Sequence, residues 1–396
     1  DLHEKKMGEL DEALKVKVLL AQALFGNPDI LLLDEPTNGL DVATISWLED
    51  FLADYDKIVI VVSHDRHFLN QVCTQMCDVD FGKIKMYVGN YDFWLQSSRL
   101  AAQMRADANA KKEEKIKELN DFIARFSANA SKSKQATSRK KQLEKITLDD
   151  IKPSSRKYPF VKFESQRDLG NDLLRVENVS KTIDGVKILD NINFTIRPGE
   201  KAAILSRSDL AQTTMMQILA GTLKPDTGTV KYGQTVITSS LPRDLDANFN
   251  NEELSILDWL RQYATKEQND NTFLRGFLGK MLFSGDDIQK QIKVLSGGEK
   301  VRCMLSKMML EQGNTLLLDD PTNHLDLESI TSLNDALVSF NGSVIFTSHD
   351  HEFISTIADH LVEISDNGSI DRAETTYDEF LAHEIVRQQV AKLYEK

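Results

Sequence analysis

Two short stretches of the sequence place acidic residues directly after an apolar run, and each is followed further along by a histidine. Residues 31–41 read LLLDEPTNGLD and residues 316–326 read LLLDDPTNHLD, an offset of 285. The same offset relates two copies of Ser-His-Asp, at residues 63–65 and 348–350. One acid to hold a magnesium ion and a second to polarise a water molecule are what hydrolysis of a nucleoside triphosphate requires. The candidate groups are Asp34, Glu35 and His64 in the first copy and Asp319, Asp320 and His349 in the second.

A pair of glycines forms a third motif, ahead of the second acidic pair. LSGGE occupies residues 295–299 and is followed by a helical pattern that contains Lys300 and Arg302. Adjacent glycines and a serine at the start of a helix expose backbone N–H groups to a phosphate, and the helix dipole adds to the attraction. The predicted phosphate-contacting residues are Ser296, Gly297, Gly298 and Glu299.

The repeat also predicts the elements that position these groups. In each copy an apolar run ends in the two acids, a turn and a helical stretch follow, and a second β-branched run leads to Ser-His-Asp. Continuous apolar strands that alternate with helices predict a parallel sheet covered on both faces, and therefore two α/β domains of one type. The predicted parts are the C-terminal portion of the first domain (1–95), a linker (96–166), the second domain (167–383) and a short tail (384–396).

The linker is strongly basic. Residues 97–166 hold 17 Lys and Arg against 9 Asp and Glu, in a chain whose net charge is −13. Two helical patterns separated by a break at residues 127–133 predict a helical hairpin with a basic tip. Such a concentration of positive charge attracts phosphate backbones, although a solvated charged helix would explain the charge equally well. The candidate phosphate contacts are Lys132, Lys134, Arg139, Lys140 and Lys141.

The composition argues against several classes of protein. An apolar fraction of 41% with 28% charged residues is typical of a folded protein. No apolar run approaches the roughly 18 to 20 residues of a membrane helix and no leader sequence is visible, so we expect a cytoplasmic protein. Three cysteines without a CxxC pair fit neither a disulfide framework nor a zinc site. The chain begins at Asp1 within a helical pattern, which predicts that an N-terminal segment is missing.

Taken together, the motifs resemble those of the ATP-binding-cassette family. LSGGE resembles its signature motif, LLLDE and LLLDD its Walker B strand, and Ser-His-Asp its switch histidine. Two cassettes joined by a basic helical linker resemble the ABC-F subfamily of translation factors, most nearly its YbiT-like branch, over essentially the whole chain. The resemblance implies P-loop NTPase folds, ATP and Mg²⁺ as ligands, and ATP hydrolysis. It also implies a monomer whose cassettes pair within one chain and whose linker contacts ribosomal RNA and the P-site tRNA from the ribosomal E site.

The phosphate-binding loop of the second cassette departs from the family pattern. Where a GxxGxGKT run is expected, residues 206–214 read SRSDLAQTT, so the glycines are gone and Gln212 stands at the lysine position. Thr213 keeps the position of the magnesium ligand, with Thr214 beside it. Because Asp209 places negative charge where a phosphate would bind, we expect weak or no nucleotide binding by this loop. Arg243 and Ile183 replace the family's Q-loop glutamine and adenine-stacking aromatic residue.

The departures from the family pattern converge on one composite site. Cassettes of this family pair head to tail, so the phosphate-binding loop of one faces the signature of the other. The offset aligns LSGGE with residues 10–14, LDEAL, and this degenerate signature would face the loop at residues 206–214. The other site would combine the first acidic pair and His64 with residues 296–299 and with a loop that the offset places upstream of residue 1. The resemblance thus predicts one competent and one structural ATP site, and little ATPase activity from these 396 residues alone.

Two other interpretations stay open at this point. A basic helical arm would also suit a DNA-associated ABC ATPase, although only about 16 residues follow Phe380 and they contain no basic coiled coil. The ATP-binding subunit of a transporter would need a membrane partner, and a basic hairpin between cassettes offers such a subunit no evident advantage. The sequence therefore favours a ribosome-associated ATPase.

Overall fold

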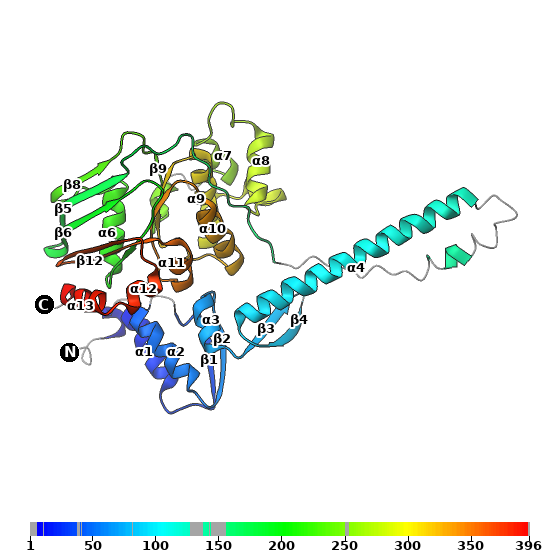
Figure 1. Ribbon diagram of the computed structural model, residues 1–396, viewed down its shortest axis with the longest axis horizontal. Helices are drawn as coiled ribbons and strands as arrows, with labels where there is room; N and C mark the ends of the chain where they lie inside the picture. Colours follow the sequence, from blue (N-terminus) through cyan, green and yellow to red (C-terminus); the bar gives the residue numbers. More distant parts are fainter. Residues whose placement is uncertain are drawn as a thin grey trace. The chain divides into compact units, whose positions relative to one another are not determined.

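The protein, seen in a computed structural model, divides into two compact units (Figure 1). The larger unit comprises Asp1–His67 and Lys157–Lys396, and the smaller comprises Phe68–Arg156. The residues that the structure describes are 6–10, 12–37, 40, 42–80, 82–126, 138–141, 143, 156–249 and 253–394.

A six-stranded sheet forms the centre of the second cassette. Its strand order is β13-β12-β7-β11-β10-β9, and all neighbours are parallel except β12 and β13. Every residue of β10 and β11 is buried, as expected for parallel strands that are covered on both faces. The predicted parallel α/β sheet is therefore confirmed for this cassette. The strands are β7 (Lys201–Leu205), β9 (Thr238–Leu241), β10 (Thr315–Asp319), β11 (Ser343–Thr347), β12 (His360–Ser365) and β13 (Gly368–Ala373).

Two hydrophobic cores lie on opposite faces of this sheet. Alternate residues of a strand point to opposite faces, so Leu317 packs in one core and its neighbours Leu316 and Leu318 pack in the other. The core around Leu317 joins the main sheet to helix α6 (Asp209–Leu219) and to an antiparallel sheet of order β6-β5-β8. These three strands are β5 (Leu174–Ile183), β6 (Val186–Ile196) and β8 (Thr227–Tyr232).

The second core is built largely by helices. Its buried residues come from the helices between residues 256 and 280, from the helix that begins within the signature motif and from the helices that follow the second acidic pair. The helices are α7 (Ile256–Arg261), α8 (Asn271–Lys280), α9 (Gly297–Glu311), α10 (Leu327–Ser339), α11 (His351–Ile357), α12 (Tyr377–Ala382) and α13 (Glu384–Leu393).

The portion of the first cassette in this unit repeats the central strands of the second. Strands β1 (Ile30–Asp34) and β2 (Ile58–Val62) pair in parallel and in the register of β10 and β11, and helices α1 (Glu12–Leu24) and α2 (Val42–Ala53) accompany them. Leu32 and Ile60 are 68% and 55% exposed, whereas the residues at the same positions in the second cassette, Leu317 and Ile345, are 1% and 0% exposed. Within the described residues, one apolar face of the β1–β2 pair is therefore uncovered.

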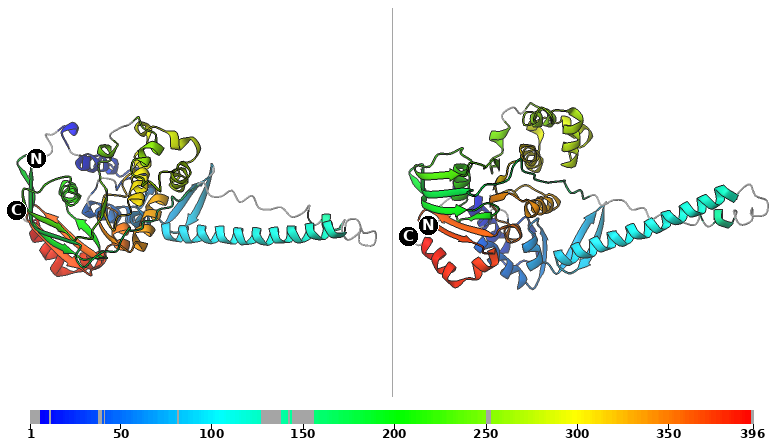
Figure 2. Two further views of the ribbon diagram at one scale, coloured as in Figure 1. Left: turned by 90° about the horizontal axis from the view of Figure 1, so that it is seen from above. Right: turned by 45° about the horizontal axis from the view of Figure 1, so that its top comes forward.

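The smaller unit consists of a β-hairpin and a long helix. Strands β3 (Gln75–Asp80) and β4 (Lys83–Val88) pair antiparallel, and α4 (Tyr91–Phe126) runs beside the hairpin and continues past it (Figure 2). Helix α3 (Arg66–Val72) lies at the boundary of the two units. Residues 138–141 are again helical, and the predicted tip at residues 127–133 lies outside the described residues.

Three side chains of the smaller unit contact one another near the start of α4. The guanidinium of Arg156 lies 2.5 Å from a carboxylate oxygen of Asp78 and 4.9 Å from the ring of Trp94. The indole N–H of Trp94 donates to the other oxygen of Asp78 at 3.4 Å. These contacts hold the end of the linker against the hairpin and the first turn of α4.

Although α4 spans 36 residues, none of the helices in the described ranges is both long and apolar enough to cross a membrane.

The linker bounds differ from those expected from the sequence. Helix α4 begins at Tyr91, before the predicted boundary at residue 96. At the other end, Phe163 is buried in a core of the second cassette, its ring 6.1 Å from that of Phe340. The N–H of Phe160 donates to the carbonyl of Lys280 at 2.8 Å. Residues 157–166 therefore pack as part of the second cassette.

One buried histidine joins strands β12 and β13 of the second cassette to the residue that precedes β7. His360 is 1% exposed, and its ring nitrogens lie 2.9 Å from Glu200 and 2.6 Å from Asp371. Burial alone would lower the pKa of His360, but the hydrogen bonds and charges of Asp371 and Glu200 outweigh it and raise the pKa above the ordinary 6.5. The imidazolium therefore stabilises the folded state at pH below about 6.5, and this contribution is lost as the pH rises through the higher folded-state pKa.

Replacing His360 by glutamine is expected to lower the free energy of unfolding by about 1–3 kcal/mol at pH 6, since it removes the buried cation that is hydrogen-bonded to Glu200 and to the more exposed Asp371. The difference between wild type and variant should shrink as the pH is raised to 9. Denaturant titrations of both proteins across this range test the prediction, because the other titrating groups are shared and cancel in the difference. A pH-independent difference would contradict it.

Candidate active sites

The first acidic site lies where strands β1 and β2 end. Glu35 directly follows Asp34, the last residue of β1, and adopts a left-handed backbone conformation with φ of 47°. Its N–H donates to the carbonyl of Val62 at 2.8 Å, which ties the residue to the end of β2. The N–H of His64 donates to Oε2 of Glu35 at 3.2 Å, and its Nε2 lies 3.6 Å from Oε1. The structure thus brings together the acid and the histidine of the first copy.

The carboxylate of Glu35 has the properties of a general base. Burial raises its pKa, hydrogen bonding and charge from His64 lower it, and the charges of Asp34 and Asp65 raise it further, leaving it above the ordinary value of 4.5. Its Oε1 is buried and accepts no hydrogen bond from any residue that the structure describes. This oxygen can therefore accept a hydrogen bond from a water molecule.

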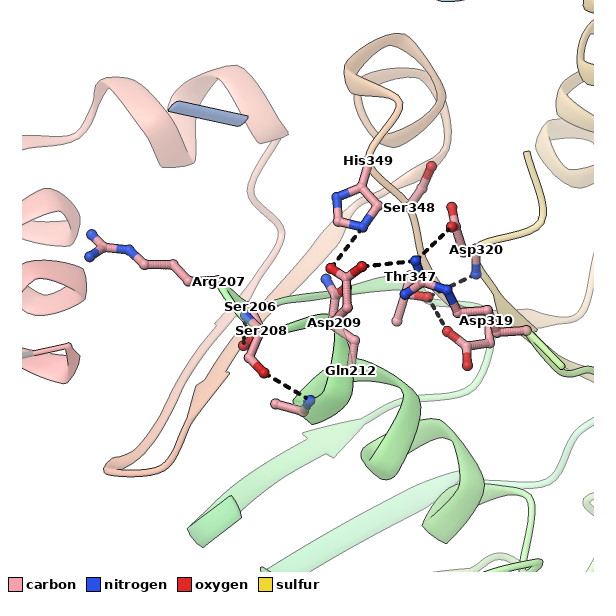
Figure 3. Close-up of polar contacts among 12 residues, drawn as sticks. Ser206, Arg207, Ser208, Asp209, Gln212, Asp319, Asp320, Thr347, Ser348 and His349 are labelled. Carbon is pink, nitrogen blue, oxygen red and sulfur yellow. Dashed lines mark hydrogen bonds and ion pairs between the residues drawn. The ribbon is translucent and has the colours of Figure 1, made fainter. Parts of the chain in front are cut away.

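The second acidic pair repeats this local geometry. Asp320 has φ of 51°, and its N–H lies 3.2 Å from the carbonyl and 2.9 Å from the hydroxyl of Thr347 at the end of β11. The same hydroxyl donates to Asp319 at 2.8 Å (Figure 3). Asp319 is 4% exposed, and burial raises its pKa against the opposing hydrogen bond of Thr347. The strand-end backbone is therefore the same in both copies of the repeat.

The loop between β7 and α6 holds the residues expected to contact phosphate in the second cassette. Thr213 lies beside Asp319, as a pair of magnesium ligands would, and Thr214 is buried in the helix. Gln212, at the lysine position, is 3% exposed, and its side-chain amide donates to the carbonyl of Ile204 at 3.2 Å. The side chain thus points back into β7 and offers no cation to a phosphate.

The sequence indicated the charge of Asp209 but not its partners. Asp209 lies 3.1 Å from Nε2 of His349 and 2.8 Å from the guanidinium of Arg243, which is also 3.6 Å from Asp320. The hydrogen bond from His349 holds the pKa of Asp209 well below its usual range, against burial and with further help from Arg243. For His349, burial lowers the pKa, but Asp209 and Asp320 outweigh burial and raise it. The arginine at the Q-loop position, Arg243, is the feature of the sequence that could have indicated this network.

The signature motif forms the start of helix α9. Ser296 is the N-cap: its hydroxyl accepts from the N–H of Glu299 at 3.3 Å, and the carboxylate of Glu299 accepts from the N–H of Ser296 at 2.9 Å. Glu299 was predicted to contact nucleotide, and in the structure its carboxylate takes part in this capping box. The N–H groups of Gly297 and Gly298 lie in the first turn, where they have no partner within the helix. These two donors are the ones available to a phosphate.

Gly298 also lies close to the backbone of the segment that follows the second acidic pair, where a larger residue would not fit. A Cβ at Gly298 would lie 2.7 Å from the carbonyl oxygen of His324. We expect Gly298→Ala to lower the melting temperature by about 3 °C, since backbone atoms must move. ATP turnover should fall about tenfold, because we expect the displaced N–H groups to contact a phosphate of the nucleotide. The control Gly276→Ala adds a methyl group with nothing within 4 Å and should be neutral or stabilising. Equal effects of the two variants in thermal melts and phosphate-release assays would contradict this.

The remaining predicted residues are only partly described. Arg139, Lys140 and Lys141 are exposed on the short helical stretch 138–141. Lys132 and Lys134 lie outside the described residues. In the degenerate first signature, helix α1 begins at Glu12, within LDEAL.

Comparison with known proteins identifies the family. A family model described as ABC transporter matches residues 189–323, and an extension model with the same description matches residues 77–163. The chain is 59% identical to the Bacillus subtilis protein named uncharacterized ABC transporter ATP-binding protein YkpA, covering 100% of this chain and 73% of that protein. It is 46% identical to the Escherichia coli O157:H7 probable ATP-binding protein YbiT (93% and 69% covered) and 32% identical to Arabidopsis thaliana ABC transporter F family member 2 (93% and 54%).

The solved structures agree with this assignment at the level of the fold. A structure of RNase-L inhibitor matches with a TM-score of 0.63 at 17% identity, covering 99% of this chain and 68% of that one. The archaeal ribosome recycling factor aABCE1, solved in complex with the ribosomal stalk protein aP1, matches with the same TM-score of 0.63 at 17% identity (99% and 69% covered). Two cassettes of this fold carry the acidic strand ends, the switch histidines and the signature described above. The chain therefore belongs to the ABC-F type of ATP-binding-cassette proteins, in the branch that includes YbiT, and its enzymatic activity is ATP hydrolysis.

Proposed function

We propose that this protein is a cytoplasmic ATPase that acts on the ribosome near the E site and the P-site tRNA and so regulates translation. The observation that carries the proposal is the long helix α4 and the exposed basic stretch 138–141, placed between two cassettes in the sequence. Single lysine and arginine side chains on a helix contact the phosphates of folded RNA without reading its bases. The match to a ribosome recycling factor of the same fold supports the proposal.

One competent ATP site would drive this action. Asp34 would hold the magnesium ion that bound ATP requires, and Oε1 of Glu35, which has no other hydrogen-bond partner among the described residues, would accept a hydrogen bond from the attacking water. His64, held against Glu35, would contact the γ-phosphate or that water. The N–H groups of Gly297 and Gly298 would face the phosphates from the opposite cassette. This site also needs a phosphate-binding loop from the first cassette.

The second site does not fit a nucleotide in the same way. A magnesium position survives at Thr213 and Asp319, but Gln212 supplies no positive charge and Asp209 supplies a negative one. We therefore assign this site a structural role and derive no catalytic step through it. Pairing of the cassettes would then depend on one molecule of ATP for each cycle.

Co-sedimentation with ribosomes tests the proposal. The protein is prepared with the phosphate-binding loop of the first cassette and with Glu35→Gln, so that bound ATP is not hydrolysed. We expect it to pellet with ribosomes in the presence of ATP but not ADP, and to bind free duplex DNA at least tenfold less tightly at about 0.15 M salt. Binding to duplex DNA alone would favour a DNA-associated ATPase, and binding to neither would overturn the proposal.

A further inference from the structure

The loop between β7 and α6 uses its own backbone donors within the protein. The N–H of Ser208 donates to the hydroxyl of Ser206 at 3.2 Å, and the N–H of Ala211 donates to Ser208. The N–H of Arg207 donates to the hydroxyl of Tyr394 at 2.9 Å. In a phosphate-binding loop, successive N–H groups converge on the ligand. Here these three donors already have protein acceptors.

The C-terminal residues hold this loop in place. The guanidinium of Arg207 lies over the ring of Tyr394 at 4.2 Å and points away from Asp209 (Figure 3). The hydroxyl of Tyr394 in turn donates to the buried carboxylate of Glu363 at 2.5 Å. The loop is thus anchored to β12 through the residue that follows α13.

The groups that would sense a phosphate face a carboxylate instead. His349 follows β11 and Arg243 follows β9, and both reach the side chain of Asp209 on the first turn of α6. His349 is the switch histidine by position, and Arg243 also approaches Asp320, the acid that follows the Walker B strand. The carboxylate of Asp209 therefore pairs with His349 and Arg243 from two different loops, as a phosphate group would.

We infer that Asp209 is an internal ligand of the second cassette: its carboxylate occupies the phosphate position, excludes nucleotide, and holds His349 and Arg243 in place without ATP. The inference deepens the proposed function and rests on it for the structural role of this site. Asp209 is then the residue that determines specificity here, because it decides whether the site accepts an external anion. The chemical class that could replace it is a small oxyanion such as inorganic phosphate.

Removal of the carboxylate tests this directly in the full chain. Asp209→Ala should lower the melting temperature by about 4 °C in sodium chloride, because Arg243 and His349 lose their anion. At equal ionic strength, about 20 mM inorganic phosphate should restore at least half of this loss and shift the wild type by less than about 1 °C. Asp209→Asn, which keeps the size but not the charge, should show a smaller loss and little rescue.

Two controls separate a local anion site from a general effect. Asp226→Ala removes another paired aspartate of this cassette, bound to Lys181 at 2.7 Å, and should not be rescued by phosphate. Asp209→Ala combined with Arg243→Gln should lose the rescue. Equal phosphate binding by wild type and Asp209→Ala, or a variant with unchanged melting and no phosphate response, would overturn the inference. The melting readout is independent of ribosome binding, so a failure of the proposed function is seen separately.

Discussion

Glu35→Gln is expected to reduce kcat for ATP hydrolysis by about 10²–10⁴-fold, whereas Asp320→Asn should change it by less than about twofold. The two residues hold the same position in the repeat and the same left-handed backbone conformation, so the comparison is closely matched. They differ in their surroundings. Glu35 has a carboxylate oxygen with no hydrogen-bond partner among the described residues, whereas Asp320 lies 3.6 Å from Arg243 in the network around Asp209.

The measurement is the rate of phosphate release by protein that carries the first phosphate-binding loop, with nucleotide binding measured alongside. Glu35→Gln should still bind ATP, which shows that the loss lies in the chemical step. Asp320→Asn should lower thermal stability rather than turnover, because Arg243 loses part of its charge partner. Equal losses of kcat in both variants would show that two sites hydrolyse ATP.

The repeat in the sequence predicted the strands, their parallel pairing and the acids at their ends. An apolar run is sufficient for this because a strand buried on both faces leaves a local pattern of β-branched and aliphatic residues. The left-handed backbone at Glu35 and Asp320 was not predicted, although a repeat of sequence at equivalent strand ends explains why the two residues share it. It could not show that Leu32 is exposed where Leu317 is buried, because exposure depends on what covers the face.

The partners of Asp209 were beyond sequence analysis for a different reason. Arg243 is 34 residues away and Tyr394 lies 187 residues beyond Arg207, and no periodicity connects such positions. The packing of Phe163 escaped prediction likewise, since a short extended segment is placed by one or two side chains. The start of α4 at Tyr91 was not predicted either. The sequence therefore indicated which phosphate-binding residues the second loop lacks, while the structure shows the protein partners of Asp209 and of Arg207.

Neutralising the basic tip of the linker is expected to weaken ribosome binding about 100-fold at 0.1 M salt while leaving basal ATP hydrolysis within about twofold. Each phosphate contact removed also lowers the slope of log affinity against log salt by about 0.7 to 0.9, so the variant should be less sensitive to salt. Co-sedimentation across a salt series measures both quantities. The variant replaces five residues with glutamine: Lys132, Lys134, Arg139, Lys140 and Lys141.

A matched control exists on the shaft of the same linker. Four lysines of α4 are interspersed with glutamates, and one of them, Lys115, pairs with Glu118 at 3.1 Å. Their positive charge is largely compensated locally, so their replacement should change ribosome affinity by less than about threefold. An effect as large as that of the tip would mean that total charge, and not its position, attracts RNA. The control lysines are Lys111, Lys112, Lys115 and Lys117.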